Sequence, residues 1–227
     1  MKAALLNWIS NCPLGILICI LGILGNGISI CVWRGIIRKR LDSGAATSMY
    51  FISLAVIDSF VLIFFILVET IPASNSAVMH SYSYLFFYCY FGYPLFYFFV
   101  LVSIWLLVAM TISRCIIVSN PLKGRIICNS FRTFCSIIII TVGFCGINVP
   151  RFFIYYPKPI NDTYFLAKTE FGHSRGAHMY KFWVHCMLLV LVPWASLCFM
   201  NAGLLCTCFL SFRKPMWPRN SLFTTCN

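Results

Sequence analysis

Acidic residues are scarce in this sequence, and so is charge of either sign. Of 227 residues, 5 are Asp or Glu and 17 are Lys or Arg, so charged residues make up 10% of the chain and hydrophobic residues 61%. A soluble domain has roughly 25% charged and about 45–50% apolar residues. With a mean hydropathy of +0.89, the chain is therefore neither a soluble globular domain nor a disordered one. The net charge of +12 would also suit nucleic acid, but basic cytoplasmic loops explain it in a membrane protein, and we expect no nucleic-acid partner.

Motifs for catalysis and metal binding are also missing. The sequence has no G-x-S-x-G, P-loop or G-x-G-x-x-G, which carry acyl-transfer and phosphate-binding chemistry. His173, His178 and His185 lie close together in the chain, but they have neither Cys partners nor H-E-x-x-H spacing. The sequence therefore predicts neither an enzyme nor a metal centre.

The 13 cysteines form no disulfide framework. Most lie inside apolar segments, where a free Cys acts as a small buried hydrophobe. Cys12, Cys89 and Cys186 are the candidates for the outer side of the membrane, so we expect at most one extracellular disulfide. Cys206 and Cys208 lie near the cytoplasmic end of the last apolar segment, where they are candidates for palmitoylation.

Five apolar segments are each long enough to cross about 30 Å of hydrocarbon. They are Ser10–Trp33, Ala46–Thr70, Tyr84–Ser113, Phe134–Tyr156 and Phe182–Phe212. The strands of an outer-membrane barrel would alternate over ~10 residues, whereas these segments are continuous and contain Gly and Pro, which bundled helices tolerate. We predict an all-α multipass bundle over residues 10–212, with a short extracellular segment at 1–9 and a cytoplasmic tail at 213–227.

The distribution of basic residues predicts the orientation of the bundle. Eleven Lys and Arg lie in the first loop, the third loop and the tail, and six lie on the other side. Since basic residues favour the cytoplasm, the chain should begin outside and end inside. The long outer loop contains Asn161-Asp162-Thr163, an acceptor for N-glycosylation at Asn161.

A cleaved signal peptide is the alternative interpretation of the first segment, since Lys2 precedes an apolar run. Pro13–Trp33 is longer than a signal core, contains no A-x-A-like site and meets the basic cluster at Arg34–Arg40 directly. We therefore expect a retained membrane span.

Polar residues within the apolar segments are the most informative ones. Asp58 lies in the middle of the second segment, and Asn26 and Ser103 lie at mid-span in the first and third. An ionisable group in hydrocarbon costs several kcal/mol and normally faces the bundle interior with a partner. We expect these three to form an internal polar pocket, which either holds a hydrated cation such as Na⁺ or is a hydrogen-bonded network without an ion.

Several motifs resemble those of the rhodopsin-like G-protein-coupled receptors. They are Gly25-Asn26 in the first segment, Ser53–Asp58 (SLAVID) in the second, and Ser103–Cys115 (SIWLLVAMTISRC) followed by Pro121–Lys123 in the third. Ser103–Cys115 with Pro121–Lys123 is similar to the stretch of the family's third span that ends in Asp/Glu-Arg-Tyr and continues into a Pro-Leu loop.

Later parts of the chain continue this resemblance. Cys89 stands 25 residues before Arg114, where the family keeps its extracellular bridging Cys. Pro193, followed by Asn201, resembles the fifth span, and Asn148–Phe153 (NVPRFF) resembles the end of the fourth span in invertebrate FMRFamide-type neuropeptide receptors. The motifs cover nearly the whole chain and occur in the family's order.

The resemblance implies a function and roles for individual residues. It implies that an extracellular amidated neuropeptide binds between the outer halves of the helices and that a heterotrimeric G protein contacts Arg114. It also implies that Asp58, Ser103 and Asn26 form a polar switch and that the loop Tyr156–Lys181 helps to gate ligand access. Cys89 would be disulfide-bonded, but the loop Pro157–Lys181 contains no Cys, so the bridge must use Cys12 or Cys186 or be absent. Pro150 and Pro193 would kink their helices.

The sequence departs from the family's pattern beside Arg114. Position 113 is Ser where the family has an acid, and position 115 is Cys where it has Tyr. Arg114 therefore lacks the neighbouring carboxylate that would hold it at rest. Either basal activity rises, or Arg114 extends to the membrane interface.

The chain also ends at Asn227, shortly after the fifth segment, without a counterpart of the family's sixth and seventh helices. We expect five spans of a seven-helix fold that do not signal by themselves. Two alternatives remain: a non-signalling decoy that associates with full-length receptors, and a small transporter or channel that uses Asp58 as an ion or proton site. Transporters often contain repeated halves, and no repeat is visible here. The family's location is the plasma membrane, but retention in the endoplasmic reticulum is also consistent with a fragment.

Overall fold

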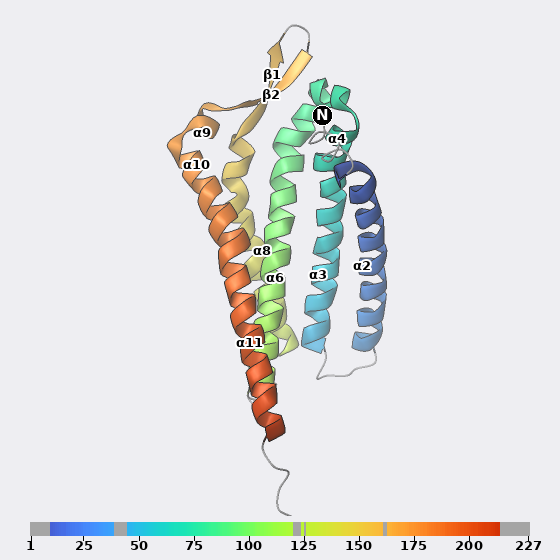
Figure 1. The fold of residues 1–227 in the computed structure, drawn as a ribbon, viewed down its shortest axis with the longest axis vertical. Coiled ribbons are helices and arrows are strands. Elements are labelled where there is room, and N and C mark those ends of the chain that lie inside the picture. Colours follow the sequence, from blue (N-terminus) through green and yellow to red (C-terminus); the bar gives the residue numbers. More distant parts are fainter. Residues whose placement is uncertain (1–9, 39–44, 120–123, 125, 161–162, 214–227) are drawn as a thin grey trace, which may run out of the picture.

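The chain forms a bundle of long helices that lie side by side, with a small hairpin at one end (Figure 1). The computed structural model describes residues 10–38, 45–119, 124, 126–160 and 163–213. Five helical spans within them are long and apolar enough to cross a membrane. The predicted all-α multipass fold is confirmed.

Each span combines an α-helix with shorter helical turns. The first is η1 (Ser10–Leu14) and α2 (Gly15–Arg38), and the second is α3 (Ala45–Phe65), η2 (Ile66–Thr70) and α4 (Ile71–Ser74). After η3 (Ser76–His80), the third is α5 (Tyr82–Phe87), η4 (Tyr88–Gly92) and α6 (Tyr93–Ser119). The fourth is α8 (Ser130–Asn148) and η5 (Val149–Phe153); after α9 (Glu170–His173), the fifth is α10 (Arg175–Phe182), η6 (Trp183–Leu191) and α11 (Val192–Arg213).

The spans are helical because the hydrocarbon offers no hydrogen-bond partners to the backbone, so each segment must satisfy its own N–H and C=O groups. They contain 24 to 38 residues. At about 1.5 Å per residue even the shortest measures about 36 Å, which exceeds the hydrocarbon thickness. The third span runs from Tyr82 to Ser119 and the fifth begins at Arg175, so both extend beyond the predicted segments.

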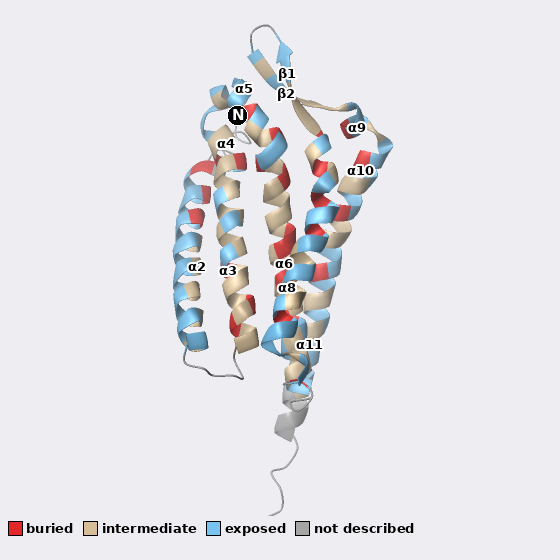
Figure 2. Ribbon diagram, turned by 180° about the vertical axis from the view of Figure 1, so that it is seen from behind, coloured by how far each residue is buried: buried red, intermediate tan, exposed pale blue. Residues whose placement is uncertain are grey.

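The third span is the centre of the bundle. α6 packs against α3, α8 and α11, and α2 packs against α3. The most apolar window of the third span is 33% buried, against 17% or less in the other spans, and buried residues run along α6 in Figure 2. The core cluster comprises Tyr50, Leu101, Val102, Leu106, Met110, Phe144 and Val184. Side chains such as Ile28, Phe199 and Leu205 are 66% to 83% exposed, as expected of a surface that faces lipid.

A β-hairpin occupies the long outer connection, where the sequence analysis predicted only a loop. β1 (Tyr155–Ile160) pairs antiparallel with β2 (Thr163–Lys168), from Tyr155 opposite Lys168 to Ile160 opposite Thr163. Both strands of a two-stranded sheet are edges, so the two prolines of β1 remove no essential hydrogen bond. Asn161, the predicted glycosylation acceptor, lies outside the described residues.

Two prolines were predicted to kink helices, and they behave differently. Pro193 lies just after the π-helical turns of η6. In a regular α-helix the proline ring would clash with the carbonyl four residues earlier, and the wider π-helical turns leave room for it. Pro150 does not lie inside an α-helix: α8 ends at Asn148, and Pro150 stands at the start of the 3₁₀ helix η5. The missing N–H of proline suits such a first turn, so Pro150 lies where the fourth span changes from α-helix to 3₁₀ helix.

Candidate functional site

The structure brings together two of the three residues predicted for the central polar pocket. Ser103 on α6 donates a hydrogen bond from its hydroxyl to Oδ1 of Asp58 on α3. On the same two helices Phe60 and Phe99 stack with their ring centroids 5.0 Å apart. The pair therefore joins the second and third spans in the middle of the apolar region.

Asn26 lies at the same depth on α2, but its side chain does not join this pair. The antiparallel α2 and α3 meet where Cys19 Sγ lies 3.7 Å from the Leu62 carbonyl and where the Trp33 and Phe51 rings stack at 4.3 Å. Asn26 falls between these two contacts, opposite Asp58. Among the residues that the structure describes, it forms no hydrogen bond with Asp58 or Ser103. Of the three residues predicted for the pocket, the structure thus joins Asp58 and Ser103 by a hydrogen bond and does not add Asn26.

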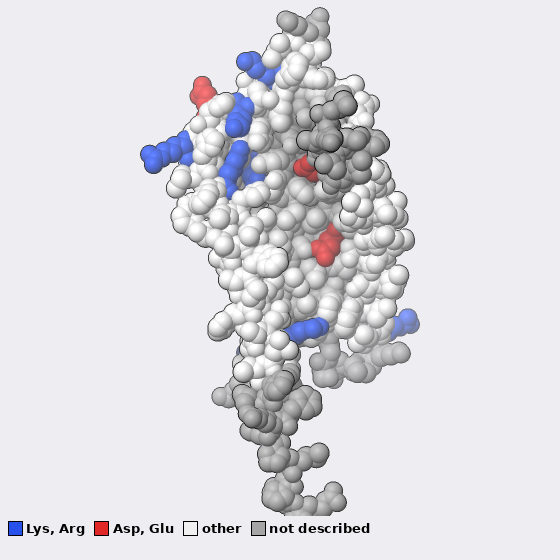
Figure 3. Space-filling view, viewed as in Figure 1, with Lys and Arg blue, Asp and Glu red and all other residues white. Residues whose placement is uncertain are grey.

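The Asp58–Ser103 pair is partly open to the surroundings, since both side chains are of intermediate exposure. Figure 3 shows acidic atoms among uncharged residues in the middle of the bundle, with Lys and Arg toward its two ends. Within the described part of the chain no group of three or more His, Cys, Asp or Glu side chains is placed to hold a metal ion. The polar pair therefore offers oxygen ligands from Asp58 and Ser103 but not a complete cation cage.

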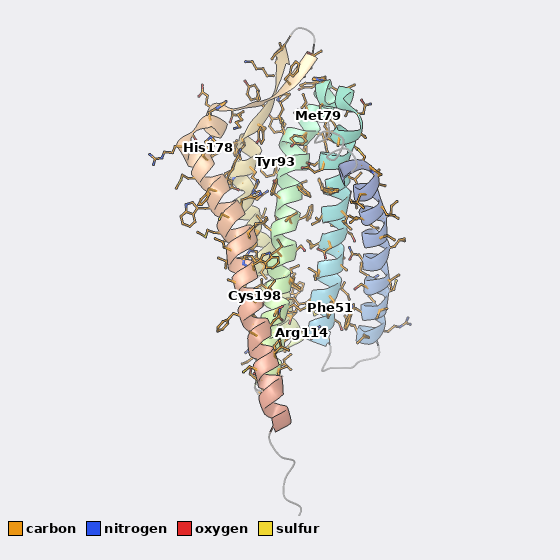
Figure 4. All side chains as sticks on the ribbon, viewed as in Figure 1. Phe51, Met79, Tyr93, Arg114, His178 and Cys198 are labelled. Carbon is orange, nitrogen blue, oxygen red and sulfur yellow. The ribbon has the colours of Figure 1, made fainter. Side chains whose placement is uncertain are left out.

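Arg114 lies at the opposite end of α6 from the hairpin, beside Phe51 of α3 (Figure 4). Its side chain is exposed, and its guanidinium carbon lies 5.1 Å from the centroid of the Phe51 ring. Ser113 donates to the carbonyl of Ala109 on its own helix, at 3.0 Å, and does not hold the arginine. An exposed cation–π contact is worth about 0.5–1 kcal/mol, so Arg114 is only weakly held and remains accessible.

The predicted disulfide at Cys89 is not formed among the described residues. Cys89 is a fully buried free thiol in η4, and Cys12 and Cys186 are also free. Cys12 is buried against the second span, with its Sγ 3.9 Å from the Thr70 carbonyl. Of the palmitoylation candidates, Cys206 is free and exposed on α11, while the side chain of Cys208 lies outside the described ones.

A second polar site, which the sequence analysis missed, surrounds Arg151 at the hairpin end of the bundle. Arg151 is only 1% exposed. Its Nη1 donates to the hydroxyl of Tyr93 at 3.0 Å, and its guanidinium carbon lies 3.8 Å from the centroid of the Tyr97 ring. The rings of Tyr93 and Tyr180 lie 5.5 Å and 5.9 Å from the same carbon. Arg151 is therefore enclosed by tyrosines from the third and fifth spans.

Three polar atoms of this site are buried without a hydrogen-bond partner. They are Nε and Nη2 of Arg151 and Oδ1 of Asn148. The amide nitrogen of Asn148 is satisfied, since it donates to the Pro94 carbonyl at 2.7 Å. Buried polar groups are normally paired, and an unpaired buried charge is especially costly. The Arg151 site is thus incomplete as it stands.

Local sequence explains how the site is assembled. Pro150 ends α8, and the 3₁₀ turn that follows places Arg151 three residues after Asn148, on the same face of the helix. Tyr93 and Tyr97 are four residues apart and face the same side of α6. The only indication of this site in the sequence is Arg151 itself, a single arginine at the end of an apolar span with no acid nearby in the chain.

No protein-family model matches the chain, and no curated protein matches it either. The likeness to receptors therefore depends on the sequence motifs quoted above.

Proposed function

We propose that the chain is a membrane protein of the G-protein-coupled receptor type, which receives an extracellular peptide at the hairpin end and responds at the Arg114 end. The observation that carries the proposal is the hydrogen bond between Ser103 and Asp58. A partly buried polar contact between two helices in hydrocarbon can act as a two-state element, since a relative movement of α3 and α6 would break or replace it. Plasma-membrane location and contact with a G protein are part of this proposal.

The two ends of the central helix support the proposal. α6 carries Tyr93 and Tyr97 in the aromatic site at its outer end and the exposed Arg114 at its inner end. A displacement of α6 by a ligand at the tyrosines would therefore reach Arg114 through one continuous helix. The weak contact of Arg114 with Phe51 leaves its guanidinium available to a cytoplasmic partner.

A second candidate function is that of a partner that modifies other receptors. The half-exposed Asp58–Ser103 pair favours it, because polar side chains facing lipid at mid-span are costly and another chain would cover them. Retention in the endoplasmic reticulum would agree with a chain that waits for such a partner.

One experiment tests both candidates. The chain is expressed in cells that lack related receptors, alone and together with a full-length peptide receptor, and a panel of peptides with amidated or free carboxyl ends is applied with a second-messenger readout. A saturable, peptide-specific response of the chain alone supports the receptor and would contradict the expectation from the sequence that the five spans do not signal by themselves. A changed response of the co-expressed receptor supports the partner. The absence of both effects would contradict the proposal.

The matched variants are Ser103→Ala and Ser59→Ala. Ser59 is on α3 next to Asp58, but its hydroxyl donates to the Ala55 carbonyl of its own helix at 2.7 Å. Ser103→Ala should alter the response, and Ser59→Ala should leave it unchanged.

A further inference from the structure

The free edge of Arg151 has a defined shape. In a guanidinium group Nε and Nη2 lie on the same edge and direct two N–H bonds in parallel, and Nη1 lies on the other side. In Arg151 the Nη1 side is occupied by Tyr93, whereas Nε and Nη2 are both buried without a partner. Two parallel N–H donors match the two oxygens of a carboxylate.

No acid among the described residues supplies a carboxylate to this edge. Three of its five acids, Asp58, Glu69 and Glu170, are among the described residues, and none pairs with Arg151. Glu69 and Glu170 are exposed. The hydroxyl groups nearby are neutral and cannot balance the charge. Lys181 adds a further positive charge at this end, since its Nζ donates to the Tyr155 hydroxyl at 3.3 Å, and Lys and Arg gather over α9 and α10 in Figure 3.

We propose that Arg151 anchors an anion site which takes the carboxylate of an extracellular ligand at the hairpin end of the bundle. The unpaired Oδ1 of Asn148, on the same helical face, would accept an N–H from the ligand next to that carboxylate. The ring of Tyr97 supplies an apolar wall, whereas Tyr180 adds a hydroxyl that interacts with Arg151 and donates to the Ile147 carbonyl at 2.8 Å. Together these groups fit an acylated amino acid or a peptide end with a free carboxylate.

The site is closed to solvent, so binding must displace a neighbouring ring. Tyr155 is one such ring: it is half-buried and meets Tyr93 edge-on at 5.1 Å. It belongs to β1, which follows η5 nearly directly, so a movement of the hairpin would shift the Tyr155 ring away from Tyr93, which holds Nη1 of Arg151. This inference rests on the proposed function only in placing the ligand outside the cell.

The test uses the purified full chain in a phosphate-free detergent and two probes that differ in a single group, N-acetylphenylalanine and N-acetylphenylalaninamide. The acid should raise the melting temperature and the neutral amide should not. Equal shifts with both probes, or no shift with the acid at its highest soluble concentration, would overturn the proposal. This comparison needs no variant, so it does not depend on whether a variant folds.

Variants then locate the effect. Arg151→Lys keeps the charge but loses the paired edge, and should weaken binding of the acid by roughly tenfold or more. Arg151→Gln should abolish it, and the control Arg175→Gln, which changes an exposed arginine at the same end, should not. Binding of the acid that persists in Arg151→Gln would overturn the proposal.

Two further experiments test whether another group balances the charge of Arg151. If Glu69→Gln lowers the melting temperature as much as Arg151→Gln, the pair is internal and the proposal is wrong. If phosphatidylglycerol stabilises the chain through Arg151 and the acid does not compete, a lipid headgroup occupies the site and the proposal is also wrong. A failure of peptide signalling would contradict the proposed function but leave this binding result intact.

Discussion

The hydrogen bond between Ser103 and Asp58 can be tested by a double-mutant cycle. Ser103→Ala removes the donor and leaves the Asp58 carboxyl half-buried without it, while Asp58→Asn keeps the shape of the acceptor but changes its charge. Because the two groups contact each other across α3 and α6, the effect of one substitution should depend on the presence of the other.

The expected magnitude follows from the environment of the pair. Interhelical hydrogen bonds in membrane proteins contribute about 0.6 kcal/mol on average and up to about 1.7, and a bond to a charged group lies at the upper end of the general range, about 1.5–3 kcal/mol. Partial exposure reduces this value, so we expect a coupling free energy of about 1 kcal/mol. For a chain of 150–250 residues, 1 kcal/mol corresponds to a shift of about 2–4 °C in melting temperature.

The assay is thermal unfolding in detergent of the wild type, both single variants and the double variant. The control cycle combines Ser59→Ala with Asp58→Asn, since the Ser59 hydroxyl bonds its own helix. Additivity of Ser103→Ala and Asp58→Asn within about 0.3–0.5 kcal/mol would show that the pair is not coupled and would refute the reasoning. The same melts in sodium and in choline chloride distinguish a cation site from a simple network, because only a cation bound at Asp58 gives a sodium effect that Asp58→Asn removes.

Three further predictions concern packing and topology. Gly22→Val should destabilise the chain by about 1 kcal/mol, the low end for overpacking, because a Cβ there would lie 2.6 Å from Leu62 Cδ1 and this side chain must shift. Gly25→Val, with no atom within 4 Å, should be nearly neutral in the same melts. Trp105→Phe should cost about 1 kcal/mol in unfolding free energy, since the indole N–H donates at 2.9 Å to a backbone carbonyl of η6, and an unchanged melt would show that bond to be unimportant. A tag at the carboxyl end should be cytosolic and Asn161 should accept glycan in cells; a tag accessible from outside would reverse the predicted orientation.

The behaviour of individual residues shows which inferences depended on neighbours in space. Asp58 was expected to have a partner because a charge in hydrocarbon is costly, and Ser103 provides it. Asn26 was expected in the pocket for the same reason, but a residue at mid-span need not contact the polar residues of neighbouring helices. Cys89 was assigned a disulfide by resemblance, and its burial without a bridge depends on the packing of η4.

The sequence by itself determined the five helical spans and the separation of basic residues between the two ends. Continuous apolar runs of this length must be helical in hydrocarbon, whatever their neighbours, because each backbone group finds its partner within the same helix. Local chemistry also favours the end of α8 at Pro150, since proline lacks the N–H that would continue a helix.

Only the tertiary structure decided the surroundings of Arg151. In the sequence Tyr93, Tyr97, Arg151 and Tyr180 are spread over the third, fourth and fifth spans, and no spacing indicates that they meet. Their contact depends on how α6, η5 and α10 pack. Whether an arginine pairs with a carboxylate depends in turn on every chain segment that lies within a few ångströms. That is why the unpaired guanidinium edge is visible in the fold but not in the sequence.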